Sequence, residues 1–121
     1  MSIEKIISAI QSKPDSVEFN DVIDVIEANY DYSPAAFKNG ETENTAGSNE
    51  GSCKIFAFAL INQLSEQQTL ACFGKYYRDD VLGNPGGDDH ANIRNFMQHG
   101  WKGIAFESTA LVSKGISGKA G

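Results

Sequence analysis

Cysteine, proline and long apolar runs are all scarce in this sequence. Two of its 121 residues are cysteine and three are proline. The cysteines, Cys53 and Cys72, lie among apolar residues, so we expect free, buried thiols rather than a disulfide framework. The richest apolar run, residues 55–61, is much shorter than the ~18 residues that span a membrane. The first residues lack the basic and apolar regions of a Sec signal peptide, so we expect the chain to fold in the cytoplasm of the producing cell.

Positive charge is also in short supply. Ten Lys and Arg face sixteen Asp and Glu, which gives a net charge of −6 and an isoelectric point near 4.7. General nucleic-acid binders and proteins of anionic membranes need a basic surface, so neither class of partner is expected. A hydrophobic content of 40% and an aromatic content of 10% are typical of a globular chain, and this length suits one domain.

Apolar side chains recur with the period of an α-helix in five segments of the chain. The expected helices cover approximately residues 3–10, 19–30, 53–64, 66–81 and 90–99. The third has apolar residues almost all the way round, so we expect it to be central and buried. The side chains expected to cap these helices are Ser2, Ser52, Ser65, and Asp88 or Asp89. Gly74 lies inside the fourth segment and predicts a close helix crossing there.

The segments between the helices predict a small amount of β-structure. Residues 35–37 and 104–107 are expected to form short strands. Residues 38–52 are almost entirely polar or glycine, which predicts a long loop that is either functional or a simple surface excursion. The predicted fold is therefore α+β, a helix-rich single domain of about five helices with a small β-sheet or hairpin. The domain should cover residues 1–112, with a flexible tail over residues 113–121.

The sequence Gly51–Ser52–Cys53 at an expected helix start is one candidate for catalysis. A thiol in the first helical turn has a lowered pKa and is more easily a thiolate. Papain-like enzymes use a similar arrangement, and His90 or His99 could follow as the base. The alternative is that Cys53 is a small buried residue that packs the start of the helix. Nothing else in the sequence predicts an enzyme.

The acidic and polar residues around the fifth helix could bind a metal or a partner. An EF-hand beginning at Asp80 fails because its third position is Leu82 and its sixth is Pro85, so no metal and no cofactor are predicted. His90 and Arg94 are four residues apart and should share one helix surface. A polar binding patch could join the residues His90, Asn92, Arg94, Tyr77 and Arg78. The alternative is an ordinary solvated face.

Several ordered stretches resemble the HopJ family, small bacterial proteins named as type III secretion effectors. The residues that carry the resemblance are FKNG (37–40), NTAG (44–47), GSCKIFAF (51–58), TL (69–70), FG (73–74), YRDDVL (77–82), DHANIRNFM (89–97) and GW (100–101). The resemblance extends over roughly residues 3–111. It implies no catalytic residue, cofactor or substrate.

The resemblance implies a protein that a type III system delivers into a host cell, where it binds a host protein. We expect no enzymatic activity and leave the oligomeric state open. Two alternatives remain at this stage. One is a bacterial interaction protein that stays in the cytoplasm, and the other is a small cysteine hydrolase that uses Cys53 with His90.

Overall fold

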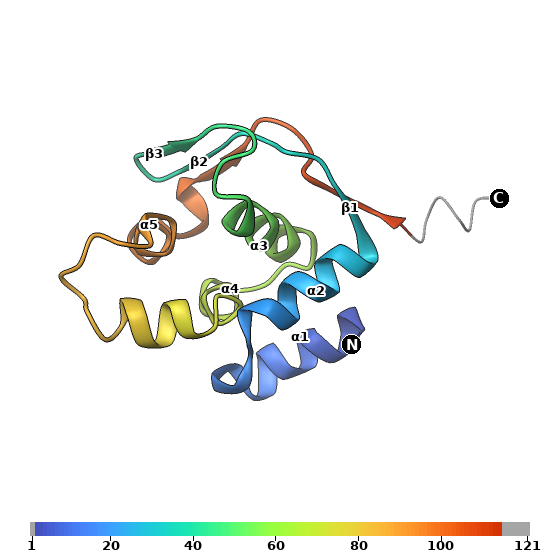
Figure 1. Ribbon diagram of the computed structural model, residues 1–121, viewed down its shortest axis with the longest axis horizontal. Helices are drawn as coiled ribbons and strands as arrows, with labels where there is room; N and C mark the ends of the chain where they lie inside the picture. The colour runs from blue at the N-terminus through green and yellow to red at the C-terminus, as the bar shows by residue number, and fades with distance from the viewer. Residues whose placement is uncertain (1, 115–121) are drawn as a thin grey trace.

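The computed structural model describes residues 2–114 and arranges them as helices on two sides of one central helix (Figure 1). The α-helices are α1 (Ile3–Ser12), α2 (Phe19–Asn29), α3 (Glu50–Ile61), α4 (Glu66–Ala71) and α5 (Ala91–His99). Short helical segments of other types are η1 (Pro14–Ser16), η2 (Tyr76–Val81) and η3 (Gly100–Gly103). The strands are β1 (Tyr30–Tyr32), β2 (Phe37–Asn39), β3 (Thr42–Asn44), β4 (Ile104–Phe106) and β5 (Leu111–Ser113). The predicted helix-rich α+β class is confirmed.

Helix α3 forms the centre of the core, as its all-round apolar sequence predicts. Phe56 in this helix is completely buried, and its ring lies 5.0–6.4 Å from four other aromatic rings, centroid to centroid. Those rings belong to Phe37, Phe73, Phe96 and Trp101. Because they come from β2, the turn after α4, α5 and η3, one side chain connects most of the fold.

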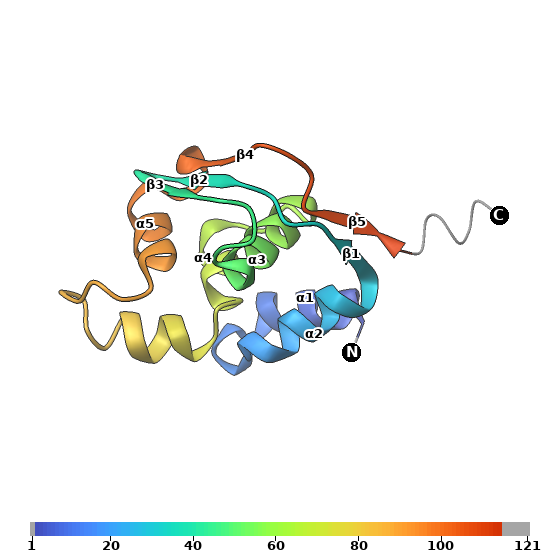
Figure 2. The same cartoon turned by 45° about the horizontal axis from the view of Figure 1, so that its top comes forward.

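Two small antiparallel sheets cover the side of α3 opposite α1 and α2 (Figure 2). The first pairs β1 with β5, and the second has the strand order β3–β2–β4. Strand β2 therefore pairs with a neighbour in sequence, β3, and with β4 from near the other end of the chain. This second sheet lies beside α5.

The predicted loop over residues 38–52 is wrong in most of its length. Residues 37–44 form the β2–β3 hairpin around Gly40, whose φ of 61° is unfavourable for residues other than glycine. Helix α3 begins at Glu50, with Asn49 rather than Ser52 at its N-cap. Polar composition hid the hairpin because its buried polar residues, Asn39 and Asn44, bond to Asn92 in α5, as described below.

The prediction of one continuous helix over residues 66–81 is also wrong, because Gly74 interrupts the helix. Gly74 has a φ of 59°, and a Cβ atom there would lie 2.7 Å from the backbone nitrogen of Phe19. The helix consequently divides into α4 and the π-helical segment η2. Gly74 does make a close contact, but it lies in a turn against the start of α2, so the predicted helix crossing is absent there; the capping box at Ser65 is confirmed.

The described part of the chain reaches slightly beyond the predicted domain boundary. Strand β5 continues through Ser113, one residue into the expected tail. Residues 115–121 of that expected tail lie outside the described residues. Within the described residues, no helix combines the length and hydrophobicity that a membrane span requires.

Candidate functional site

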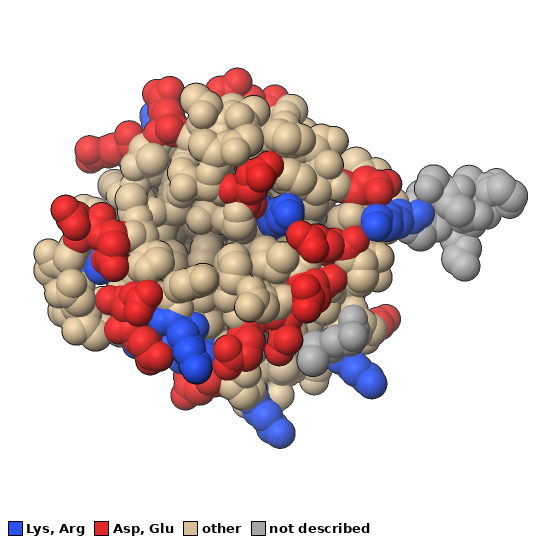
Figure 3. Space-filling model, viewed as in Figure 1, with Lys and Arg blue, Asp and Glu red and all other residues tan. Residues whose placement is uncertain are grey.

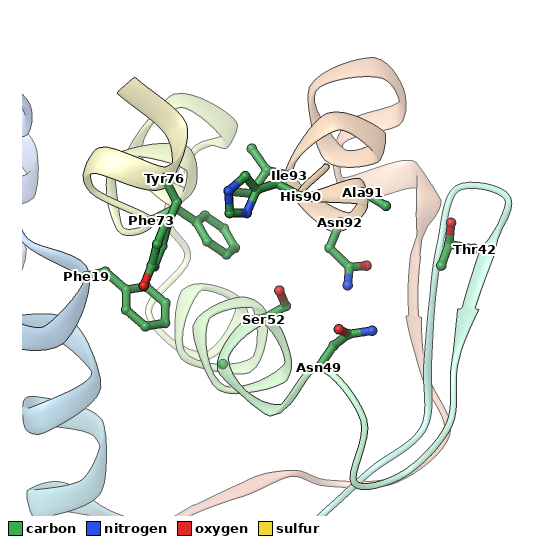
Figure 4. Close-up of a pocket in the computed structure, with 11 residues that line it drawn as sticks. Phe19, Thr42, Asn49, Ser52, Phe73, Tyr76, His90, Ala91, Asn92 and Ile93 are labelled. Carbon is green, nitrogen blue, oxygen red and sulfur yellow. The ribbon is translucent and has the colours of Figure 1, made fainter. Parts of the chain in front are cut away.

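A pocket of about 390 Å³ lies where the N-terminal ends of α3 and α5 approach each other. Figure 3 shows this face hollowed among uncharged side chains, and Figure 4 shows the side chains that line the hollow. One wall is apolar or aromatic and consists of Phe19, Phe73, Tyr76 and Ile93. The other is polar and consists of Thr42, Asn49, Ser52, His90 and Asn92. Such a two-sided pocket is typical of a ligand-binding site.

The helix ends at this pocket have no side-chain caps. The N-cap residues, Asn49 for α3 and His90 for α5, both adopt left-handed backbone conformations, with φ of 50° and 52°. Neither side chain accepts a hydrogen bond from the first turn of its helix. The predicted cap at Asp88 or Asp89 is therefore wrong. The first-turn N–H groups of a helix have no acceptor within that helix, so both ends present free donors.

A network of asparagine side chains supports the polar wall from behind. Asn39 and Asn44 each donate from Nδ2 to the Asn92 side-chain oxygen, at 3.0 and 3.1 Å. The Asn92 amide in turn donates to Oδ1 of Asn44, which also accepts from Asn49 at 2.7 Å. Asn39, Asn44 and Asn92 are 0%, 3% and 7% exposed. The network therefore joins the β2–β3 hairpin to the starts of α3 and α5.

His90 lies at the edge of the pocket and is held in place by an acidic residue. Its Nε2 atom is 3.0 Å from a carboxylate oxygen of Asp80, and its ring centroid is 5.3 Å from that of Tyr76. Figure 4 shows the imidazole ring beside Tyr76 and Phe73 at the opening between η2 and α5. Its pairing to Asp80 connects these two segments.

Arg94 stabilises the loop before α5 instead of joining His90 in a binding patch. Its guanidinium group donates to the Asp89 carboxylate at 2.6 Å and to the backbone oxygens of Asp89, Asn84 and Pro85. The hydrogen bond from Arg94 to the carboxylate lowers the pKa of Asp89 below its usual value. Tyr77 and Arg78 line a different hollow near Pro14, whose oxygen accepts from Arg78. The structure thus distributes the five residues of the predicted patch over different places: His90 and Asn92 line the pocket between α3 and α5, Tyr77 and Arg78 line the other hollow, and Arg94 lines neither.

Cys53 does not line this pocket. Its side chain is 1% exposed, and its thiol donates to the Ala35 oxygen at 3.7 Å. Burial raises the pKa of Cys53, so the expectation of a pKa lowered by the helix end is wrong. Burial also raises the pKa of Cys72, to about 12. A buried neutral thiol is a poor nucleophile, which argues against the cysteine-hydrolase alternative.

No cluster of three or more His, Cys, Asp or Glu suited to a metal ion occurs in residues 2–114.

Sequence reasoning missed Ser52, Asn39, Asn44 and Asn49 as site residues. The signal available was indirect: each lies in one of the stretches FKNG, NTAG and GSCKIFAF or beside it. Those stretches are separated in sequence, and only the hairpin brings them to the ends of α3 and α5.

Comparisons with known proteins found a family model and a solved structure that match the chain. A family model described as HopJ type III effector protein matches residues 3–111. A solved structure titled "Crystal structure of unknown function protein VPA0580" is 54% identical to the chain, with a TM-score of 0.93. The similarity covers 94% of this chain and 95% of the other. No curated protein matches. The family match extends over most of the chain, and the protein therefore belongs to the HopJ family.

Proposed function

We propose that this HopJ protein acts by binding another protein, and that the pocket between α3 and α5 is the centre of the contact. The observation that carries the proposal is the convergence of unpaired polar groups with the exposed ring of Tyr76 and the partly exposed ring of Phe19 in one pocket. Aromatic side chains next to polar groups are common at the centres of protein interfaces. The buried state of Cys53 and the lack of a clustered metal site in residues 2–114 favour binding over catalysis.

The family name supports a further part of the proposal, delivery of the protein into a host cell by a type III system. In that case the partner is a host protein. The alternative is that the protein remains in the bacterial cytoplasm and binds a bacterial partner through the same pocket. A reporter fused after residue 30, compared in the producer with and without a working type III apparatus, distinguishes the two locations.

The binding proposal is tested by blocking the pocket with Ala91→Trp. Ala91 is exposed and lines the pocket at the first residue of α5, so a large side chain there should be tolerated by the fold. Ala28→Trp, at an exposed position of α2 outside the pocket, is the matched control. Quantitative affinity capture from host and bacterial extracts should recover a partner with the wild type and with Ala28→Trp but not with Ala91→Trp. Equal recovery by all three proteins would contradict the proposal.

A further inference from the structure

The polar wall of the pocket carries hydrogen-bond donors that have no acceptor among residues 2–114. Gly51 and Ser52 are in the first turn of α3, and Ala91 and Asn92 are in the first turn of α5. All four line the pocket, and their backbone N–H groups lack intrahelical acceptors. The Ser52 hydroxyl, which Figure 4 shows directed into the same space, also has no partner in this part of the chain.

The buried side chain of Asn92 supplies an independent donor at the same place. Asn39 donates to the Asn92 backbone oxygen at 2.8 Å, which fixes the orientation of the Asn39 amide. The same Asn39 nitrogen lies 3.0 Å from Oδ1 of Asn92, so Oδ1 is the acceptor and Nδ2 occupies the other side. Nδ2 has two hydrogens, and only one has an acceptor in residues 2–114, on Asn44. Figure 4 shows Asn92 directed into the pocket although the residue is 7% exposed.

The charges around the pocket favour an anion. None of the residues that line it is Asp or Glu, although the chain as a whole carries a net charge of −6. Three acidic residues near the pocket have partners of their own. Glu50 accepts from the Tyr32 hydroxyl, Asp89 accepts from Arg94, and Asp80 pairs with His90. Two helix N-termini also add partial positive charge at this position. An acceptor-rich anionic group is therefore the complement of the polar wall.

The residues that line the pocket and its volume indicate which anion it can bind. No Lys or Arg lines the pocket, and those are the usual partners of a doubly charged phosphate, so a singly charged carboxylate fits better. The apolar wall of Phe19, Phe73, Tyr76 and Ile93 requires an apolar group beside that carboxylate. A volume of about 390 Å³ is near the lower end of ligand pockets and suits a small group rather than a folded segment.

We propose that the pocket binds a carboxylate that is attached to an apolar group, as in the C-terminal residue of a protein or a small apolar carboxylic acid. This inference rests on the proposed function, because it names the chemical group that the same pocket recognises. The first-turn N–H groups, the Ser52 hydroxyl and the Asn92 amide bind the carboxylate. The aromatic wall contacts the apolar group.

The test uses the full chain and three probes: the dipeptide N-acetyl-Ala-Phe, its C-terminal amide, and phenylacetate. Binding is followed by ¹H–¹⁵N NMR titration. The free-acid dipeptide should shift the amide resonances of Gly51, Ser52, Ala91 and Asn92. It should bind about tenfold or more tightly than its amide, since hydrogen bonds to a charged group are the stronger kind. Phenylacetate that binds as tightly as the dipeptide would identify a small acid as the source of the carboxylate.

Ser52→Asp provides a variant that separates binding from folding. A carboxylate in the first turn of α3 interacts favourably with the helix dipole, so the fold should be retained, but the new charge occupies the anion site. Gln67→Glu makes the same charge change in the first turn of α4, away from this pocket. Ser52→Asp should abolish binding of the free acid, whereas Gln67→Glu should leave it unchanged.

The outcomes distinguish this inference from the proposed function. Equal binding of acid and amide, or absence of binding by all three probes, would overturn the carboxylate assignment. If Ala91→Trp still lost its protein partner in that case, the proposed function would stand with a different ligand group. If the acid bound at the pocket but Ala91→Trp kept its protein partner, the carboxylate assignment would stand and the proposed function would be wrong.

Discussion

Removing the Asn92 side chain tests whether the asparagine network stabilises the fold. The Asn92 carboxamide makes three side-chain hydrogen bonds with Asn39 and Asn44. At about 1 kcal/mol for each bond, Asn92→Ala loses about 3 kcal/mol of stability. Alanine has the better helix propensity, by up to ~0.7 kcal/mol. The expected net loss in the free energy of unfolding is therefore about 2 kcal/mol.

Asn95→Ala is the matched control because it gains the same helix propensity in the same helix. Asn95 makes one side-chain hydrogen bond, to the Thr42 hydroxyl, and is only partly buried. Its expected net change is close to zero, since a gain of up to ~0.7 kcal/mol offsets a loss of about 1 kcal/mol.

Equilibrium urea unfolding measures the difference between these two variants. With a urea dependence of about 2 kcal/mol per M, the midpoint for Asn92→Ala should fall about 1 M below that for Asn95→Ala. Midpoints within about 0.2 M of each other would refute the reasoning. That result would mean that water forms hydrogen bonds in place of the Asn92 side chain with no net loss in the free energy of unfolding.

Two further predictions concern the backbone and the thiols. Gly74→Ala should lower the free energy of unfolding by at least ~2 kcal/mol, because residue 74 has a positive φ and the new Cβ would meet the Phe19 backbone. The control is Gly86→Ala, which has open space around the new Cβ. It should change the free energy of unfolding by less than ~0.5 kcal/mol in the same urea assay. Stability should also fall as pH rises above ~8.5, since the thiols of Cys53 and Cys72 have raised pKa values when folded and release protons only on unfolding. Cys72→Ala should reduce that decline, and an unchanged slope between pH 8 and 10 would contradict the assignment.

Local patterns in the sequence determined the positions of most helices and the identity of the core. The cap at Ser2 and the capping box at Ser65 both form as predicted. These features depend on residues within one or two turns of each other, so a linear reading captures them. The central position of α3 also followed from its composition, because a helix that is apolar all round needs to be buried on all sides.

Contacts between distant residues determined the hairpin, the break at Gly74 and the pocket. The β2–β3 hairpin has a buried polar face because Asn39 and Asn44 bond to Asn92, about fifty residues later in the chain. Gly74 breaks its helix because the start of α2 lies against it. Asn49, Ser52 and Asn92 come from different helix ends with no shared periodicity in the sequence, so only the tertiary structure could place their side chains around one pocket. The sequence by itself determined which segments are helical, and long-range packing and hydrogen bonding determined where the binding groups meet.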